Sequence, residues 1–325
     1  MSRIAITRRL PDVAFARLRD AGHDVRLHDA DTPPSRAELL DLVHGAHGLI
    51  CLLSDRIDDE VLDAAGPDLK VVANYAVGLD NVDRVACAAR DVAVAHTPSV
   101  LSEATADQAW ALLLAVARKV VEGHRLVASG GWQGWSPLQL LGTELHGRRF
   151  GVVGLGRIGQ AAARRARGFG MEVVYHARHA RPEAEAELAA RKVPLSELLE
   201  TSDVVSLHCP LTDETRHLLD ADALARMKPT AILVNTARGE VVDEAALVDA
   251  LAQGLIAGAG LDVFEREPRL HPRLPALPNV VLAPHLGSAT VATRDAMARL
   301  VADAVVDVLA GRRPDHLAPA PRADA

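Results

Sequence analysis

A glycine-rich turn in the middle of the chain places the strongest constraint on its fold. An apolar stretch over 150–154 runs into the turn, and an alanine-rich stretch leads away from it to residue 170. The turn has the pattern GxGxxG and consists of Gly154, Leu155, Gly156, Arg157, Ile158 and Gly159. Glycines in this order between a strand and a helix permit close approach of a pyrophosphate, and the helix N-terminus offers it unpaired N–H groups. The motif therefore predicts a dinucleotide-binding unit.

Strands alternate with short helices on both sides of this turn, in two separate series. Before it, strands are predicted at 3–7, 23–29, 47–53, 69–74 and 91–96. After it, they are predicted at 171–177, 203–210, 231–239, 257–264 and 279–285. Strands alternating with helical stretches indicate parallel sheets covered on both faces. The predicted fold class is α/β, with two doubly wound parallel-sheet domains of the Rossmann-like or flavodoxin-like kind.

The segment between the two series is helical in its pattern. Apolar residues recur at helical spacing from Ser102 to Ala128, which predicts one helix about 40 Å long. Such a helix is better suited to connect two domains than to cross over within one sheet. A final helix is expected after residue 288, followed over 312–325 by a tail rich in proline and alanine that we expect to be mobile.

Composition excludes several classes of protein. The chain has 325 residues, enough for roughly two domains, and no uninterrupted apolar run of about 18 residues that would span a membrane. A net charge of −7 and only 3% aromatic residues argue against a nucleic-acid partner. The start of the chain lacks the apolar core of a signal peptide, and its three cysteines form no metal-binding or redox pair. We expect a cytoplasmic protein without a metal site.

The end of the second strand in the nucleotide-binding series bears on cofactor choice. NAD-binding folds usually place an Asp or Glu there, on the ribose 2′-hydroxyl. In this chain no carboxylate occurs between Tyr175 and Glu183, whereas Arg178 follows the strand with His179 and Arg181 close behind. A guanidinium is suited to a 2′-phosphate. The sequence favours NADPH, with NADH possible, although Arg178 can also be read as a solvated surface charge.

Several segments carry a resemblance to a known family. GVVGLGRIGQ, LVNTARGEVVDEAAL, AGAGLDVFEREP and APHLGSAT resemble, in order and spacing, the NAD(P)-dependent D-2-hydroxyacid dehydrogenases. LLSDRID, GGWQGW and HLGSATVATR are most similar to the glyoxylate/hydroxypyruvate reductases within it. The resemblance implies a discontinuous substrate domain of residues 1–98 plus 289–325, a dinucleotide-binding domain of residues 99–288, and a cleft between them.

The resemblance also implies a catalytic set. Arg238 corresponds to the arginine that orients the substrate, and its planar fork suits a carboxylate and the neighbouring carbonyl oxygen. His285 corresponds to the proton donor for the reduced carbonyl. Glu267 corresponds to the carboxylate that favours the protonated imidazole, although Glu265 lies only two residues earlier.

Binding residues follow from matching positions. On the substrate side, the resemblance implies carboxylate binding by the backbone of Val77 and Gly78, an apolar wall at Leu53, and a hydroxyl contact from Ser288. Tyr75 either narrows the pocket or faces away, and Trp135 either reaches a neighbouring subunit or is a hydrophobic anchor. On the cofactor side, besides the glycine turn and the residues after the second strand, the matching positions are Thr105, Pro210, Thr236, Ala237, Asp262 and Gly287.

The resemblance implies reduction of small 2-oxo acids, glyoxylate to glycolate and hydroxypyruvate to D-glycerate. It also implies that the protein forms a homodimer. Other D-2-hydroxyacid dehydrogenases, acting on 2-ketogluconate, phenylpyruvate or phosphoglycerate, are alternatives within the family. A basic cluster for phosphoglycerate is not evident, and no regulatory domain is expected beyond residue 310. A nucleotide-sensing corepressor is the alternative from another class, but no peptide-docking extension is evident.

Overall fold

The computed structural model describes residues 1–319 and contains two compact units. Unit 1 comprises residues 1–101 together with the chain from Ala289 onward, and unit 2 comprises residues 102–288. The first crossing lies three residues later than the sequence predicts. Residues after the last strand of unit 1 stay with that unit because Thr97 N–H donates to Ala76 O at 2.9 Å and Leu101 is buried. The last part of the expected tail, 320–325, lies outside the described residues.

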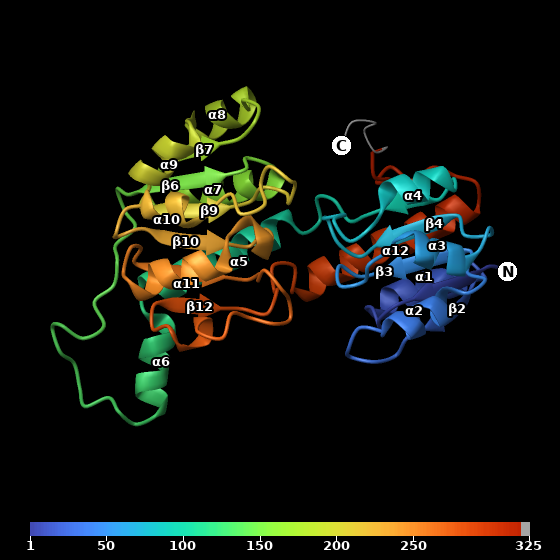
Figure 1. Cartoon of the computed structure of the whole chain (residues 1–325), viewed down its shortest axis with the longest axis horizontal. Coiled ribbons are helices and arrows are strands. Elements are labelled where there is room, and N and C mark those ends of the chain that lie inside the picture. The colour runs from blue at the N-terminus through green and yellow to red at the C-terminus, as the bar shows by residue number, and fades with distance from the viewer. Residues whose placement is uncertain (320–325) are drawn as a thin grey trace. The chain divides into compact units, whose positions relative to one another are not determined.

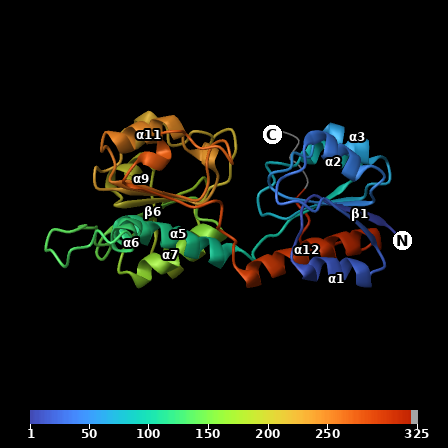
Figure 2. The same cartoon turned by 90° about the horizontal axis from the view of Figure 1, so that it is seen from below.

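Unit 1 contains a five-stranded parallel sheet in the order β2-β1-β3-β4-β5. Figures 1 and 2 show its helices in two layers, with α1 and α12 on one face and α2 and α3 on the other. Its strands are β1 (Arg3–Ile6), β2 (Asp24–Leu27), β3 (Gly48–Cys51), β4 (Val71–Asn74) and β5 (Ala93–Ala95). Its helices are α1 (Asp12–Asp20), α2 (Arg36–Val43), α3 (Asp59–Ala65), α4 (Arg84–Ala89) and α12 (Val291–Leu309).

The predicted strands of unit 1 are confirmed, whereas the predicted mobile tail is wrong for residues 316–318. Every residue of β3 and β4 is buried, as expected of strands covered on both faces. Residues 316–318 run antiparallel along β5, where Ala318 N–H donates to Val94 O at 2.7 Å and His96 N–H to His316 O at 3.4 Å. The edge strand thus orders the tail by backbone hydrogen bonds that its composition does not reveal.

Unit 2 contains a seven-stranded parallel sheet in the order β12-β11-β10-β9-β6-β7-β8. Its strands are β6 (Arg149–Val153), β7 (Glu172–His176), β8 (Arg191–Lys192), β9 (Val204–Leu207), β10 (Ile232–Asn235), β11 (Gly258–Leu261) and β12 (Val280–Leu282). Its helices are α5 (Ser102–Ala117), α6 (Val120–Ala128), α7 (Arg157–Gly168), α8 (Pro182–Leu188), α9 (Leu195–Thr201), α10 (Ala221–Ala225) and α11 (Glu244–Ala252). Strand order reverses between β6 and β9, and ligands of such sheets bind at the carboxyl ends of strands beside this switch.

The single long helix expected over 102–128 is wrong, because the chain breaks it at residues 118–119. Lys119 adopts a left-handed conformation with φ of +55°. The carbonyl of Ala117 accepts a hydrogen bond from Thr143 N–H at 2.7 Å. Gly142 packs so closely on that carbonyl that a Cβ there would lie 2.3 Å from its oxygen. The returning chain therefore takes the acceptor that a continuous helix would need.

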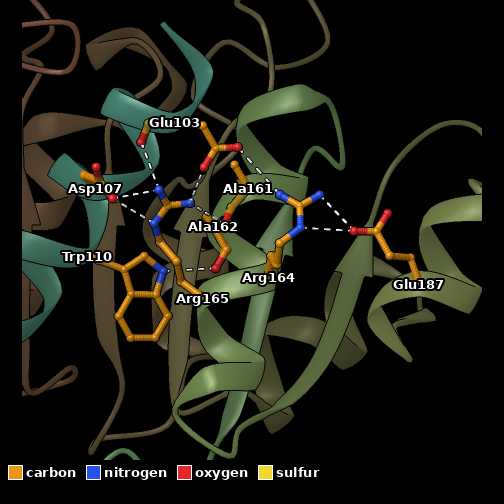
Figure 3. A network of polar contacts seen from close by, with 8 residues as sticks. All are labelled: Glu103, Asp107, Trp110, Ala161, Ala162, Arg164, Arg165 and Glu187. Carbon is orange, nitrogen blue, oxygen red and sulfur yellow. Dashed lines mark hydrogen bonds and ion pairs between the residues drawn. The ribbon is translucent and has the colours of Figure 1, made fainter.

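Helices α5 and α7 are held together by both apolar and charged contacts. Trp110 of α5 stacks on Phe150 and Phe169 and donates its indole N–H to the Ala162 carbonyl of α7 at 3.0 Å. Arg165 of α7 pairs with Glu103 and Asp107 of α5, and the neighbouring Arg164 links Glu103 to Glu187 (Figure 3). This packing fixes the helix that follows the glycine turn against the helix that carries Thr105.

The three cysteines, Cys51, Cys87 and Cys209, are free and buried. None of the helices in residues 1–319 is both long and apolar enough to cross a membrane. Within the same residues, no group of three or more His, Cys, Asp or Glu side chains is arranged to hold a metal ion.

Candidate active site

The glycine turn joins β6 to α7 and has the shape that a phosphate requires. Gly154 has φ of +95°, and a Cβ there would lie 2.6 Å from the backbone nitrogen of Cys209. A Cβ on Gly159 would lie 2.2 Å from the carbonyl oxygen of Gly154, so both positions are closed to larger residues. Gly156, at the N-cap of α7, instead faces open space. The unpaired N–H groups of the first turn of α7 are therefore accessible to an anion.

Two buried polar atoms, directly after β9 and β10, lack a partner among the described residues. Burial lowers the pKa of His208 to about 4, so its imidazole is neutral at physiological pH. The ring bonds Ser206 Oγ through Nε2 at 2.8 Å, whereas Nδ1 has no partner. The Thr236 hydroxyl at the end of β10 is likewise buried and unpartnered. Because buried polar groups are normally hydrogen-bonded, these atoms and the glycine cradle fit a bound dinucleotide.

The loop after β7 is basic and exposed. Arg178, His179 and Arg181 are all solvent-accessible, and Arg178 makes no ion pair with a described residue. The hydroxyl of the buried Tyr175 accepts from Arg181 N–H at 2.9 Å and donates to Glu185 at 2.5 Å. These two bonds fix the end of the loop and the start of α8 to β7. Pro210, at the end of β9, is also exposed, and its carbonyl accepts from the Thr215 hydroxyl at 2.7 Å.

His285 and Glu267 form a direct pair at the carboxyl ends of β11 and β12. Nδ1 of His285 donates to Oε2 of Glu267 at 2.9 Å, while the other Glu267 oxygen accepts from Phe264 N–H at 3.1 Å. The two side chains lie in the wall of a cavity of about 300 Å³ whose other lining residues are Phe264, Pro268, Leu270, Leu282, Ala283 and Pro284. A carboxylate on Nδ1 leaves Nε2 as the ring nitrogen that can exchange a proton with a ligand.

The loop that carries His285 is strained and is held by a buried aspartate. His285 has φ of +55°, a conformation that costs a non-glycine residue free energy unless its surroundings enforce it. Asp262 enforces it, since its carboxylate accepts the N–H groups of Leu286 and Gly287 at 2.7 Å each and its carbonyl accepts His285 N–H at 2.9 Å. Burial raises the pKa of Asp262, and these backbone donors partly oppose that rise.

Helix α5 and Gly287 complete this support. Gln108 donates to the Asp262 carboxylate at 3.3 Å. Thr105 lies against Gly287, since a Cβ built on Gly287 would lie 3.2 Å from the Thr105 methyl group. Both oxygens of Asp262 are therefore engaged in holding the loop, a role that the sequence does not predict for a residue it assigns to the cofactor.

Arg238 follows β10 on a backbone that packs tightly against the segment containing Glu267. A Cβ on Gly239 would lie 1.9 Å from the carbonyl carbon of Phe264. Asn235 donates to the Arg238 carbonyl at 2.9 Å and accepts Ala237 N–H at 3.0 Å, while the Arg238 guanidinium donates to Ala237 O at 2.8 Å. Sequence reasoning missed three supporting residues. Asn235 bonds the neighbouring backbone of Ala237 and Arg238, Gly239 packs on the distant backbone of Phe264, and Gln108 bonds the Asp262 carboxylate from α5.

The structure separates the two neighbouring glutamates. Glu265 is 3.3 Å from His217 Nε2 and accepts the N–H of Glu244 at 3.2 Å, on the side of α11. Of the two glutamates, Glu267 is the one that bonds the His285 ring. Ser288 lies partly exposed directly after the Asp262-bound loop, where unit 2 ends.

The remaining expected substrate residues lie in unit 1, at the carboxyl ends of β3 and β4. Leu53 is exposed, and Val77 and Gly78 are partly exposed. Of the two alternatives for Tyr75, the structure shows the side chain facing away from these residues, with its hydroxyl donating to the Arg294 carbonyl of α12 at 2.7 Å. Burial raises its pKa to about 12.

Fold and site together define a nicotinamide-dependent dehydrogenase. The family model for the D-isomer specific 2-hydroxyacid dehydrogenase NAD-binding domain matches residues 110–287, which fall within unit 2. The chain belongs to this family.

Individual relatives agree with that assignment. A glyoxylate reductase of Thermococcus onnurineus is 51% identical over 319 residues, which cover 97% of this chain and 95% of that protein. A crystallised protein of Thermus thermophilus is similar with a TM-score of 0.92 at 52% identity, covering 97% of this chain and 99% of that one. An NADPH-dependent glyoxylate/hydroxypyruvate reductase of Sinorhizobium meliloti, crystallised with NADP and malonate, has a TM-score of 0.82 at 37% identity, covering 95% and 93%.

Proposed function

We propose that this protein reduces small 2-oxo acids, converting glyoxylate to glycolate and hydroxypyruvate to D-glycerate. The observation that carries the proposal is the 2.9 Å contact between His285 and Glu267, on a loop held by the buried Asp262 in the same unit as the glycine turn and Arg238. Relatives with the name glyoxylate reductase that are about half identical over nearly the whole chain support the choice of substrate.

The proposed chemistry assigns one task to each charged side chain. A dinucleotide held by its pyrophosphate at the glycine turn would supply the hydride from its nicotinamide ring. Arg238 binds the substrate carboxylate and the neighbouring carbonyl oxygen, for which its planar fork is suited. His285 gives a proton to that oxygen as it becomes an alkoxide, and Glu267 stabilises the imidazolium before the transfer. In the reverse direction His285 accepts the proton.

In unit 1, we assign the substrate carboxylate to the backbone N–H groups of Val77 and Gly78. Leu53 is the proposed apolar wall beside C3, and the Ser288 hydroxyl in unit 2 is the proposed partner of a hydroxyl on that carbon. The last contact favours hydroxypyruvate over pyruvate, which lacks the hydroxyl.

A substrate panel tests this proposal. Initial rates with NADPH are measured for glyoxylate, hydroxypyruvate, pyruvate and phenylpyruvate. Glyoxylate and hydroxypyruvate are expected to give the highest kcat/KM. Failure to turn over either of them contradicts the proposed substrates, and a preference for phenylpyruvate favours another member of the family.

The proposed cofactor preference is for NADPH over NADH. No carboxylate stands at the carboxyl end of β7, and Arg178 and Arg181 in the following loop are exposed. A guanidinium there is suited to the 2′-phosphate. The NADP complex of the Sinorhizobium meliloti relative supports the same choice.

Replacing Arg178 by serine is expected to lower the ratio of kcat/KM for NADPH to that for NADH by about tenfold or more, the effect of losing one charge-assisted hydrogen bond. Arg191→Ser is the matched control, because Arg191 is an exposed arginine nearby that pairs with Glu197 at 2.9 Å. An unchanged ratio in Arg178→Ser, or a wild type that prefers NADH, shows that Arg178 does not read the 2′-phosphate.

We also propose that the protein forms a homodimer through the arm 120–144. No residue of α6 is buried, and the loop after it exposes Trp135 by 84% and Leu138 by 78%. Figure 1 shows this arm projecting from the body of unit 2. Contiguous exposed apolar surface of this kind is rare on monomers. A cytoplasmic location remains a prediction from the sequence.

Substituting Trp135 and Leu138 together by serine is expected to halve the mass measured by sedimentation without loss of helical circular dichroism. Val85→Ser, which changes an exposed apolar residue of α4, is the control. A monomeric wild type contradicts the dimer, and a dimeric double variant shows that the arm does not hold it.

A further inference from the structure

In the loop that follows β4, three successive backbone carbonyls accept hydrogen bonds from other residues of unit 1. Ala76 O accepts from Thr97 N–H at 2.9 Å, and Val77 O accepts from the His96 ring at 2.9 Å. Gly78 O accepts from the Asn74 side chain at 2.8 Å. Two of the donors come from the chain directly after β5, and the third is the last residue of β4.

These bonds determine where the amide hydrogens of the loop point. In a trans peptide the C=O and N–H groups point in opposite directions. In each of these peptide groups the N–H therefore points away from the donor that bonds the carbonyl. The N–H groups concerned are those of Val77, Gly78 and Leu79. These three N–H groups donate to no described residue, and their residues are partly exposed. The loop thus presents consecutive, preoriented donors to solvent, which is the arrangement that binds an anion.

The His96 contact is specific in its chemistry. A carbonyl oxygen only accepts hydrogen bonds, so Nδ1 of His96 carries the proton and donates. His96 itself is fixed by its backbone N–H, which bonds His316 O in the strand-like tail at 3.4 Å. The ring therefore holds the Val77–Gly78 peptide plane in one of its two orientations, the one in which the Val77 carbonyl points toward His96.

Asn74 extends the same support to the loop that carries Leu53. Asn74 is fully buried, and its amide nitrogen also bonds Asn81 Oδ1 at 2.9 Å. The Asn81 amide in turn donates to the carbonyls of Leu52 and Asp55 at 3.0 Å each. One pair of amide side chains therefore joins the loops after β3 and β4.

We propose that His96 and Asn74 are positioning residues that orient the backbone N–H groups of the loop 76–79 toward the carboxylate of the substrate. The proposal rests on the proposed function, because it takes a 2-oxo acid as the anion bound there. Both side chains act through the backbone: they fix the peptide planes in advance, so that carboxylate binding need not do so.

His96→Leu removes the ring donor and keeps an apolar side chain of similar size. We expect it to raise KM for glyoxylate about five- to tenfold, as expected for one hydrogen bond. The Kd for oxalate, measured by calorimetry on enzyme saturated with NADP⁺, should rise by a similar factor. The kcat and the Kd for NADPH should stay unchanged. His96→Asn, whose amide nitrogen occupies the place of Nδ1, should recover most of the loss, whereas His96→Gln, whose amide lies one bond farther out, should not.

His47→Leu is the matched control. His47 is also a partly buried histidine of unit 1 with a backbone partner, since it accepts Arg3 N–H through Nδ1 at 3.1 Å, but it precedes β3 at the opposite end of the sheet. This variant should leave KM and the oxalate Kd unchanged. If His96→Leu does not fold, the contrast between His96→Asn and His96→Gln serves in its place.

Two outcomes overturn the proposal: an oxalate Kd that His96→Leu leaves unchanged, or equal values for the asparagine and glutamine variants. The proposed function fails separately, if the wild type does not reduce glyoxylate. In that case a weaker oxalate affinity in His96→Leu still supports the role of His96, and a wild type that does not bind oxalate contradicts it.

Discussion

Replacing His285 by glutamine is expected to lower kcat for glyoxylate reduction by about 10²–10⁴, the span associated with a lost general acid. Glutamine retains a polar group and can still bond Glu267, but it cannot supply a proton. KM should change much less than kcat, because substrate binding is assigned to other groups. Steady-state rates at saturating NADPH measure both parameters.

The chain provides a matched control for this substitution. His217 forms a second imidazole–carboxylate contact in unit 2, with Glu265 at 3.3 Å. His217→Gln should therefore leave kcat close to that of the wild type. A His285→Gln enzyme with wild-type kcat, or an equal loss in both variants, contradicts the role of His285 as proton donor.

Replacing Arg238 by lysine is expected to lower kcat/KM for glyoxylate by about 10²–10³, because an ammonium cannot bind carboxylate and carbonyl oxygen together as a planar fork does. Arg238→Gln should lose at least as much. NADPH binding, followed by quenching of tryptophan fluorescence, should be unaffected. The comparison separates substrate orientation from cofactor binding.

Arg216→Gln is the control, since Arg216 is an exposed arginine of the same unit that lies 3.9 Å from Glu240. Its kcat/KM should match the wild type. If Arg238→Lys retains wild-type kcat/KM, a point charge suffices at this position, and the proposed two-point binding of the substrate is wrong.

The sequence predicts those features that depend on local pattern. Buried parallel strands appear as continuous apolar runs such as residues 48–51, and GxGxxG reveals its turn because its first and third glycines each meet a steric limit. Gly154 and Gly159 face backbone atoms within 2.6 Å of a built Cβ, so no other residue type can stand there.

What the sequence does not predict depends on contacts between distant segments. The break at Lys119 follows from the return of the chain at Thr143, and the ordered tail follows from its pairing with β5. Asp262 matches a family position assigned to the cofactor, yet its carboxylate bonds the loop that carries His285. Glu265 and Glu267 differ in the sequence only in that Glu267 matches the family position, and the structure distinguishes them by their contacts, with His217 and His285 respectively.

The central claim, that the chain transfers a hydride to a small 2-oxo acid and protonates the resulting oxygen, is tested most directly by product analysis. Hydroxypyruvate is incubated with the enzyme and NADPH deuterated at the transferable position of the nicotinamide. The account predicts D-glycerate with deuterium on C2, at a rate that His285→Gln lowers by about 10²-fold or more. Glycerate of the L configuration, deuterium-free product or an unaltered rate in His285→Gln would contradict it.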